Sequence, residues 1–171
     1  FIPEEYDGAG MGFFEFCLIN EEFWAVDPGI AHAVLCTTFG SELIILNGTE
    51  EQKNFILPKL VSGEAMMGTA ITEPDAGCDV TSATTTAVKD GDEWVINGSK
   101  MFATAGNIAD YMLTFCMTDP DNPSRHDRYS FILIPTASKG YTSTKIRGKM
   151  GIRASDTAEI SLVDVRVPLS N

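Results

Sequence analysis

The chain has 171 residues, of which 44% are hydrophobic, so it can bury a sizeable core in one domain or two small ones. Lysine and arginine together number 12 against 24 aspartate and glutamate residues, which gives a formal net charge of −12. This acidic balance argues against a surface that binds nucleic acid or another polyanion.

The cysteines and apolar segments narrow the class of protein further. Four cysteines are scattered without a C-x-x-C pair, and two histidines complete no zinc pattern, so we expect reduced thiols and no metal ion. No apolar run reaches the length of a membrane span, and no leader sequence is recognisable, although the chain does not begin with methionine. We therefore expect a soluble, cytoplasmic protein.

The first part of the chain has a helical pattern. Between residues 11 and 62, apolar residues recur at intervals of three and four, which predicts helices. The segment Asp27-Pro28-Gly29 interrupts this pattern and separates a first helix from a second one over residues 30–46. Thr49 and Gln52 have the spacing of a capping box, which predicts the start of a third helix.

After residue 64 the pattern changes to short segments rich in β-branched residues, which predict strands. The pairs Asp90-Gly91 and Asn97-Gly98 are typical of hairpin turns. The predicted fold class is therefore α+β, with N-terminal helices followed by an antiparallel β-barrel or sandwich. The expected strands cover residues 81–88, 93–96, 111–117, 129–134, 142–146 and 158–163.

The most informative segment runs from Gly68 to Asp79 and reads GTAITEPDAGCD. An apolar strand turns sharply there, because Pro74 fixes φ and Gly77 can adopt a positive φ. Such a turn exposes backbone N–H groups that suit a pyrophosphate, and Thr72 adds a hydroxyl that can donate to a heteroaromatic edge. Taken alone, the segment favours an ordinary β-turn, because short glycine motifs often occur by chance.

Five motifs occur together in a fixed order along essentially the whole chain. In this order and spacing they resemble the acyl-CoA dehydrogenase family. The resemblance implies that residues 1–63 form part of the N-terminal helical domain of that family and that residues 64–171 form its middle β domain. The motifs are Pro3–Tyr6 (PEEY), Gly48–Lys53 (GTEEQK), Gly68–Asp79, Asn97–Thr104 (NGSKMFAT) and Lys149–Thr157 (KMGIRASDT).

The resemblance implies FAD-dependent α,β-dehydrogenation of an acyl-CoA thioester, with electrons passed to an electron-transfer flavoprotein and a homotetramer as the full-length assembly. In the family, a C-terminal helical domain supplies the glutamate base and part of the flavin site. We expect this domain to be absent here, so that the chain alone is an inactive fragment. Two alternatives stay open: a related flavoenzyme that acts on a non-CoA substrate, and a non-catalytic β-domain module for binding or assembly.

Carried over by position, the resemblance implies a flavin site with three principal side chains. The Thr72 hydroxyl would bond the pyrimidine edge, Thr104 would lie against N5 and O4, and Phe102 would cover one flavin face. The alternatives are core packing for Phe102 and a solvent-facing strand position for Thr104. The full set of expected cofactor contacts is Thr69, Ala70, Ile71, Thr72, Gly77, Cys78, Phe102, Ala103 and Thr104.

Four residues depart from the pattern of the family. Cys78 stands where the family usually has a serine that contacts the pyrophosphate and the substrate, and a thiol donates more weakly than a hydroxyl. Asp7, Ala103 and Ala105 also replace the usual residues. These departures would fit a divergent substrate, a weakened flavin site or deliberate substitution.

Two further residues are candidates for contact with the substrate. In the family, the loop that contains Asp27 faces the acyl pocket, so Asp27 is a candidate catalytic acid or base. An alicyclic substrate such as a cyclohexane- or cyclohexene-carboxyl-CoA would suit a second such group. The alternative role of Asp27 is to cap the next helix. Arg125, in the polar loop 119–128, is a candidate partner for the CoA phosphates, with a solvated hairpin loop as the alternative.

Overall fold

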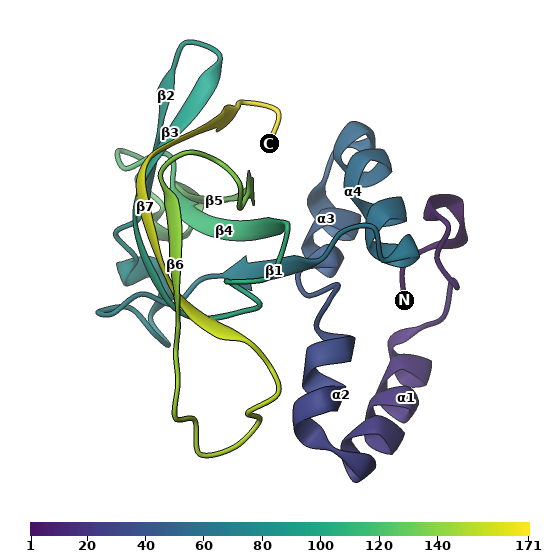
Figure 1. Cartoon of the computed structure of the whole chain (residues 1–171). Helices are drawn as coiled ribbons and strands as arrows, with labels where there is room; N and C mark the ends of the chain where they lie inside the picture. The colour runs from purple at the N-terminus through teal and green to yellow at the C-terminus, as the bar shows by residue number, and fades with distance from the viewer.

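The computed structural model describes residues 1–171 and places a group of helices on one side of a curled seven-stranded sheet (Figure 1). Helices fill the first third of the chain, and strands fill the rest. None of the helices combines the length and apolarity that crossing a bilayer requires. The elements are η1 (Glu4–Tyr6), α1 (Phe13–Val26), α2 (Pro28–Leu35), α3 (Ser41–Asn47), α4 (Glu50–Ser62), β1 (Met67–Ala70), η2 (Val80–Ser82), β2 (Thr86–Asp90), β3 (Glu93–Thr104), β4 (Tyr111–Met117), η3 (Arg125–Arg128), β5 (Tyr129–Pro135), β6 (Tyr141–Lys145) and β7 (Thr157–Pro168).

The start of α4 confirms the predicted capping box. The Thr49 hydroxyl accepts a hydrogen bond from the Gln52 N–H at 3.2 Å, and the Gln52 side chain accepts one from the Thr49 N–H at 3.0 Å. The single helix predicted over residues 30–46 is wrong, because the chain leaves α2 after Leu35 and begins α3 only at Ser41. Gly40 adopts a φ of 96° at this break, which no α-helix can continue through.

The sheet confirms the α+β class and adds two parallel pairings to the antiparallel ones. Its strand order is β1-β4-β2-β3-β7-β6, and β5 pairs with β4. Strand β1 runs parallel to β4, and β2 meets β4 in parallel at Thr86 and Met117. The remaining pairings are antiparallel. The β2–β3 hairpin lies between β1 and β4 in the sequence, so β4 returns beside β1 in the same direction, as a crossover connection requires.

One predicted turn is confirmed and the other is wrong. Strand β2 ends at Asp90, β3 begins at Glu93, and Gly91 in the connection has a φ of 62°. By contrast, β3 continues through Asn97-Gly98 with only an irregular register opposite β7. Gly98 has a φ of 152° there, and a Cβ atom would clash with Thr85, so this glycine serves a close approach within the sheet.

The start of the strand predicted over residues 81–88 is also wrong, because η2 occupies that place and β2 begins only at Thr86. The strand expected over 111–117 has the predicted bounds, and those expected over 129–134 and 142–146 lie within one residue of β5 and β6. Strands β3 and β7 extend well beyond their predicted ends. Most strand positions are thus recognisable from local sequence, but their lengths depend on their partners.

The buried side chains form two clusters. One lies inside the curled sheet and contains Ile96, Met112 and Ile160, each at most 1% exposed. The other joins α4 to the face of β4 and β5, where Leu57 and Leu113 are buried. Helix α1 belongs to neither cluster, because none of its residues is buried. The buried hydrophobic contact between the helical region and the sheet therefore involves α3 and α4, while α1 and α2 extend away from that contact (Figure 1).

Candidate functional site

The two segments predicted to form the site lie side by side. The Met101 N–H, near the end of β3, donates to the Thr72 carbonyl oxygen at 2.7 Å. The Lys100 ammonium donates to the carbonyl of Ile71 at 3.1 Å and to the carboxylate of Glu73 at 2.8 Å. The turn that follows β1 is therefore attached residue by residue to the C-terminal part of β3.

The ion pair between Lys100 and Glu73 is buried, with side chains 0% and 4% exposed. The Glu73 carboxylate also accepts hydrogen bonds from the N–H groups of Thr84 and Thr85, at 2.7 and 2.9 Å, and from the Thr84 hydroxyl at 2.9 Å. Burial alone raises the pKa of Glu73, but the bonds from Lys100, Thr85 and Thr84 outweigh it and lower the pKa to about 2. Glu73 is therefore a carboxylate at neutral pH.

Sequence reasoning missed this pair. Lys100 and Glu73 are 27 residues apart and belong to different motifs, so no periodic pattern connects them. The available signal was weak, because Lys100 is the single basic residue of its segment but Glu73 is one of three acidic residues in residues 68–79, with Asp75 and Asp79. Pairing them required knowledge that the turn lies along β3.

Phe102 occupies a strained position at the surface. Its φ is 57°, its side chain is 62% exposed, and the register between β3 and β7 shifts between Lys100 and Ala103. The exposure excludes core packing for this ring. A bulge that turns an aromatic side chain outward at an energetic cost is typical of a ligand-binding position.

The residues that follow Phe102 divide between interior and surface. Ala103 is buried at 3% exposure in the core of the sheet, so its side chain cannot face a ligand. Thr104 is half-buried, and none of the side-chain hydrogen bonds of the chain involves its hydroxyl, which leaves it free for the predicted role as a donor.

The residues at the end of β1 and just after it also differ in burial. The Thr69 hydroxyl is buried and donates to the Phe39 carbonyl at 3.0 Å, and Ala70 lies in the core at 1% exposure, so these two residues can offer a ligand only backbone groups. Ile71 and Thr72 are half-buried. Of these two residues, only Thr72 has a hydroxyl, and this hydroxyl is free to donate to a ligand because it bonds no other protein group.

The turn itself is a tight hairpin. Glu73 and Ala76 exchange backbone hydrogen bonds at 2.9 and 3.2 Å. Gly77 and Cys78 follow as exposed residues, and neither N–H donates to an acceptor in the chain. Gly77 does not use the positive φ expected of it, although open space surrounds its Cα. Two free amides at an exposed turn suit an anionic group.

Arg125 reaches this turn from the loop before β5. Its guanidinium donates to Asp79 at 3.0 Å and to Ser82 at 3.0 Å. Hydrogen bonds from the hydroxyls of Ser82 and Thr81, together with the charge of Arg125, lower the pKa of Asp79 to about 2. The structure therefore brings the two predicted substrate contacts, Cys78 and Arg125, to one edge, where Arg125 already has a carboxylate partner and remains half exposed.

Asp27 lies apart from these residues and caps a helix. Its carboxylate accepts a hydrogen bond from the Ile30 N–H at 2.8 Å, which satisfies a free donor at the start of α2. The Asp27 side chain is exposed in this chain. The structure thus shows Asp27 as the N-cap residue of α2.

The motif at residues 149–157 contacts helix α2. The His32 Nδ1 atom lies 2.8 Å from the buried Ser155 hydroxyl, and the Lys149 ammonium donates to the Ser155 carbonyl at 2.6 Å. Burial, and then the positive charge of Lys149, lower the pKa of His32. Next to Ser155, the buried Asp156 carboxylate accepts hydrogen bonds from Asn107. This connection between a helix and the β6–β7 loop has no signal in the sequence pattern.

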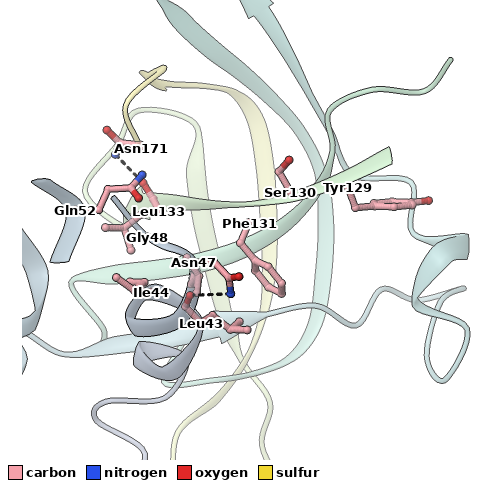
Figure 2. A pocket seen from close by; sticks show the side chains of 11 residues that line it. Leu43, Ile44, Asn47, Gly48, Gln52, Tyr129, Ser130, Phe131, Leu133 and Asn171 are labelled. Carbon is pink, nitrogen blue, oxygen red and sulfur yellow. Dashed lines mark hydrogen bonds between the residues drawn. The ribbon is translucent and has the colours of Figure 1, made fainter. Parts of the chain in front are cut away.

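A cavity of about 400 Å³ lies elsewhere, between the α3–α4 helices and strands β4 and β5 (Figure 2). Figure 2 shows that Leu43, Ile44 and Phe131 contribute apolar side chains to it. Its amide side chains are already bonded, since Gln52 donates to the Ser170 carbonyl and Asn171 to the Leu133 carbonyl. None of the predicted site residues lines this cavity, so it is separate from the edge formed by the turn and β3.

The groups at that edge fit a flavin dinucleotide. Thr72 and Thr104 supply hydroxyls without protein partners, and Phe102 supplies an exposed aromatic ring. The amides of Gly77 and Cys78 supply unbonded N–H groups for phosphate oxygens. Hydroxyl donors, an aromatic plane and free backbone amides are the groups needed to bind a heteroaromatic ring that carries a pyrophosphate.

Two family models match nearly the whole chain: "Acyl-CoA dehydrogenase, N-terminal domain" over residues 1–64 and "Acyl-CoA dehydrogenase, middle domain" over residues 68–165. The short-chain specific acyl-CoA dehydrogenase of Clostridium acetobutylicum is 39% identical, and the cyclohexane-1-carbonyl-CoA dehydrogenase of Syntrophus aciditrophicus is 37% identical. Each alignment covers 99% of this chain, which spans 45% of the length of the first relative and 44% of the length of the second.

A solved structure of a named acyl-CoA dehydrogenase also matches this chain. The glutaryl-CoA dehydrogenase of Mycobacterium smegmatis in complex with FADH2 matches with a TM-score of 0.87 and 36% identity, over 96% of this chain and 41% of that one. The order of motifs, the helix-then-sheet architecture and the sequence identity agree, and the chain therefore belongs to the acyl-CoA dehydrogenase family.

Proposed function

We propose that the full-length protein is an FAD-dependent acyl-CoA dehydrogenase and that this chain carries most of its flavin-facing edge. The observation that carries the proposal is the attachment of the turn after β1 to the Phe102 bulge, which brings Thr72, Phe102 and Thr104 to one edge. The relatives named as acyl-CoA dehydrogenases support the reaction class. We assign residues 1–63 to an N-terminal helical domain and residues 64–171 to a middle β domain.

FAD bound at this edge would supply the acceptor for the hydride that leaves the β-carbon of the acyl group. The residues of the chain would bind and orient the reactants. The Thr72 and Thr104 hydroxyls would donate hydrogen bonds to the flavin ring, and the Phe102 ring would lie against it and exclude water. The amides of Gly77 and Cys78, which bond no acceptor in the chain, would hold phosphate oxygens.

For the substrate, we propose that Cys78 and Arg125 lie along the path of the CoA moiety. Arg125 is half exposed, and its bond to Asp79 holds the guanidinium at the turn, where it can also reach a phosphate. The thiol of Cys78 is exposed and unbonded. Arg125→Lys keeps the charge but removes the planar donor pair, so we expect a higher KM for the acyl-CoA with little change in kcat.

We retain Asp27 as a candidate second acid or base for an alicyclic acyl-CoA. Its support is its place at the start of α2 and the 37% identity to a cyclohexane-1-carbonyl-CoA dehydrogenase. Asp27→Asn keeps the helix cap but removes the ionisable group. If Asp27 is catalytic, this variant lowers turnover of cyclohexane-carboxyl-CoA by orders of magnitude. An unchanged rate leaves only the capping role.

We further propose that electrons pass to an electron-transfer flavoprotein and that the full-length protein is a homotetramer. Family membership supports both statements. Light scattering on the full-length protein measures the mass of the assembly. Reduction of an added electron-transfer flavoprotein, followed after mixing with acyl-CoA, measures the transfer, and a monomeric enzyme or an acceptor that stays oxidised would contradict the respective statement.

The reaction class is tested by mixing the FAD-loaded, full-length protein with acyl-CoA esters without oxygen. We expect at least one short-chain, branched or alicyclic acyl-CoA to bleach the visible absorbance of the flavin, while the corresponding free acid leaves it unchanged. Bleaching by a nitroalkane or by a thioester on a carrier protein, but by no acyl-CoA, would instead support the alternative flavoenzyme. Failure to bind FAD would support a non-catalytic module.

A further inference from the structure

Lys100 is a fully buried lysine whose role is not explained by contact with a ligand. Its side chain is 0% exposed, and the Nζ atom bonds only the Ile71 carbonyl, at 3.1 Å, and the Glu73 carboxylate, at 2.8 Å. The ring of Phe115 lies beneath it, with 5.9 Å between Nζ and the ring centroid. Burying an ammonium group is costly, so a fold retains one where its directed bonds do something that an apolar side chain cannot.

The bonds of Lys100 hold the two residues on either side of Thr72. Ile71 precedes Thr72 and Glu73 follows it, and both are bonded to the same ammonium group. The Thr72 carbonyl is itself bonded by the N–H of Met101, the residue after Lys100. Three consecutive residues of the turn are thus fixed to two consecutive residues of β3.

Glu73 extends the same connection to a third segment. Besides Lys100, it accepts hydrogen bonds from Thr84 and Thr85, just before β2. The end of the turn is therefore held between β3 and the segment that precedes β2. An apolar pair of similar size would fill the space but would leave the Ile71 carbonyl and the amides of Thr84 and Thr85 without partners.

We propose that Lys100 is a positioning residue of the flavin site, which together with Glu73 fixes the separation between the Thr72 hydroxyl and the bulge that carries Phe102 and Thr104. Lys100 does not contact the ligand in this role. The proposal rests on the function proposed above. Because the two motifs come from distant parts of the sequence, a ring that spans both depends on how firmly they are joined.

The test uses the full-length protein with Lys100→Met, which keeps the length of the side chain but removes the charge. Val167→Ala is the control, because Val167 is 1% exposed in the same core and pairs with Trp94 at the opposite end of β3. The first readout is FAD affinity, measured by quenching of flavin fluorescence. The second is hydrogen exchange of the Met101 amide in the cofactor-free protein, relative to global stability.

We expect Lys100→Met to weaken FAD binding by about tenfold or more and to accelerate Met101 exchange beyond the change in global stability. Val167→Ala should lower global stability without either specific effect. Glu73→Gln, which keeps the shape of the side chain, is the second variant if Lys100→Met does not fold, and we expect the same two effects in smaller degree.

Two results overturn the proposal. One is a folded Lys100→Met or Glu73→Gln protein with unchanged FAD affinity. The other is a loss of affinity no greater than that of a Val167→Ala protein of equal stability. If the unmodified protein does not bind FAD, the proposed function is wrong. The exchange of Met101 then decides alone whether Lys100 holds the turn, and unchanged exchange in Lys100→Met rejects that as well.

Discussion

The sheet and helix α1 differ in how far their apolar side chains are buried. In the sheet, Ile160 and Met112 are at most 1% exposed, because the strands curl around a common interior. Helix α1 is also rich in apolar residues, but none of its side chains is buried, and Phe14 and Val26 are 71% and 87% exposed. The sheet thus completes its own core, whereas α1 carries apolar residues on several faces, which is typical of a helix with neighbours on more than one side.

Core and helix substitutions should differ most in their effect on stability. Ile160→Ala removes a fully buried side chain from the sheet, so we expect a loss of about 2 to 5 kcal/mol in the free energy of unfolding. Phe14→Ala removes an exposed side chain and should cost less than about 1 kcal/mol. Urea unfolding of both variants measures the difference, and comparable losses would show that α1 is packed as tightly as the sheet.

The buried carboxylate of the sheet should make stability depend on pH. The pKa of Glu73 falls from an ordinary value of 4.5 to about 2 on folding. The contribution of Glu73 to the free energy of unfolding is therefore present above about pH 4.5 and is lost as the pH falls toward 2. The loss is on the order of 3 kcal/mol. We expect Glu73→Gln to flatten this decrease in urea unfolding between these two pH values.

The matched control for this experiment is Glu51→Gln, since Glu51 is an exposed carboxylate in the first turn of α4. This variant should reproduce the pH dependence of the unmodified protein. A Glu73→Gln profile as steep as that of the control would mean that the buried pair does not govern acid stability.

The helix cap of α2 should contribute less. Asp27→Ala leaves the Ile30 N–H without its acceptor, and we expect a loss of about 1 kcal/mol in the free energy of unfolding. Asp27→Asn should change stability by only a few tenths of that amount, because asparagine caps helices as well as aspartate does. Equal losses in the two variants would indicate that the charge, and not the cap, stabilises this region.

The smallest effect on stability concerns the exposed bulge, where we expect stability and binding to change in opposite directions. Phe102 has a φ of 57°, so Phe102→Gly relieves backbone strain and should leave stability unchanged or raise it by about 1 kcal/mol. The same variant should weaken FAD binding, because the aromatic plane is lost.

Val88→Gly is the control for Phe102→Gly, since Val88 is also 62% exposed but has an ordinary φ in β2. Glycine should destabilise that regular strand by about 0.5 to 1 kcal/mol and leave FAD binding unchanged. Thermal unfolding measures the change in stability of both variants, and FAD titration measures the change in their affinity for FAD. A similar destabilisation at both positions would show that Phe102 is not strained.

Local chemistry explains which parts of the fold were predictable. The capping box of Thr49 and Gln52 and the turn at Gly91 each depend on a few adjacent residues, and both were predicted. The prediction of a turn at Asn97-Gly98 was wrong because a glycine is required there by the close approach of Thr85, which lies outside the local sequence pattern. The interruption at Gly40 likewise follows from pairing of the preceding loop with β1.

The candidate site shows the same division. The segment around Thr72 and the segment around Thr104 were recognised as separate motifs from their residue types. Their attachment through Lys100 and Glu73 was not predicted, because an ion pair across 27 residues leaves no periodic trace. The positive φ of Phe102 was also unforeseen, because aromatic residues rarely adopt it and only the shifted register of β3 against β7 imposes it.

The most direct test of the flavin site is a titration of FAD into the full-length protein after removal of its cofactor, followed by flavin fluorescence. The variants are Thr104→Val at the proposed edge and Thr144→Val on the exposed edge strand β6 as the matched control. We predict saturable binding that Thr104→Val weakens by about tenfold and that Thr144→Val leaves unchanged. Absence of binding, or equal affinity in all three proteins, would contradict the placement of the flavin at this edge.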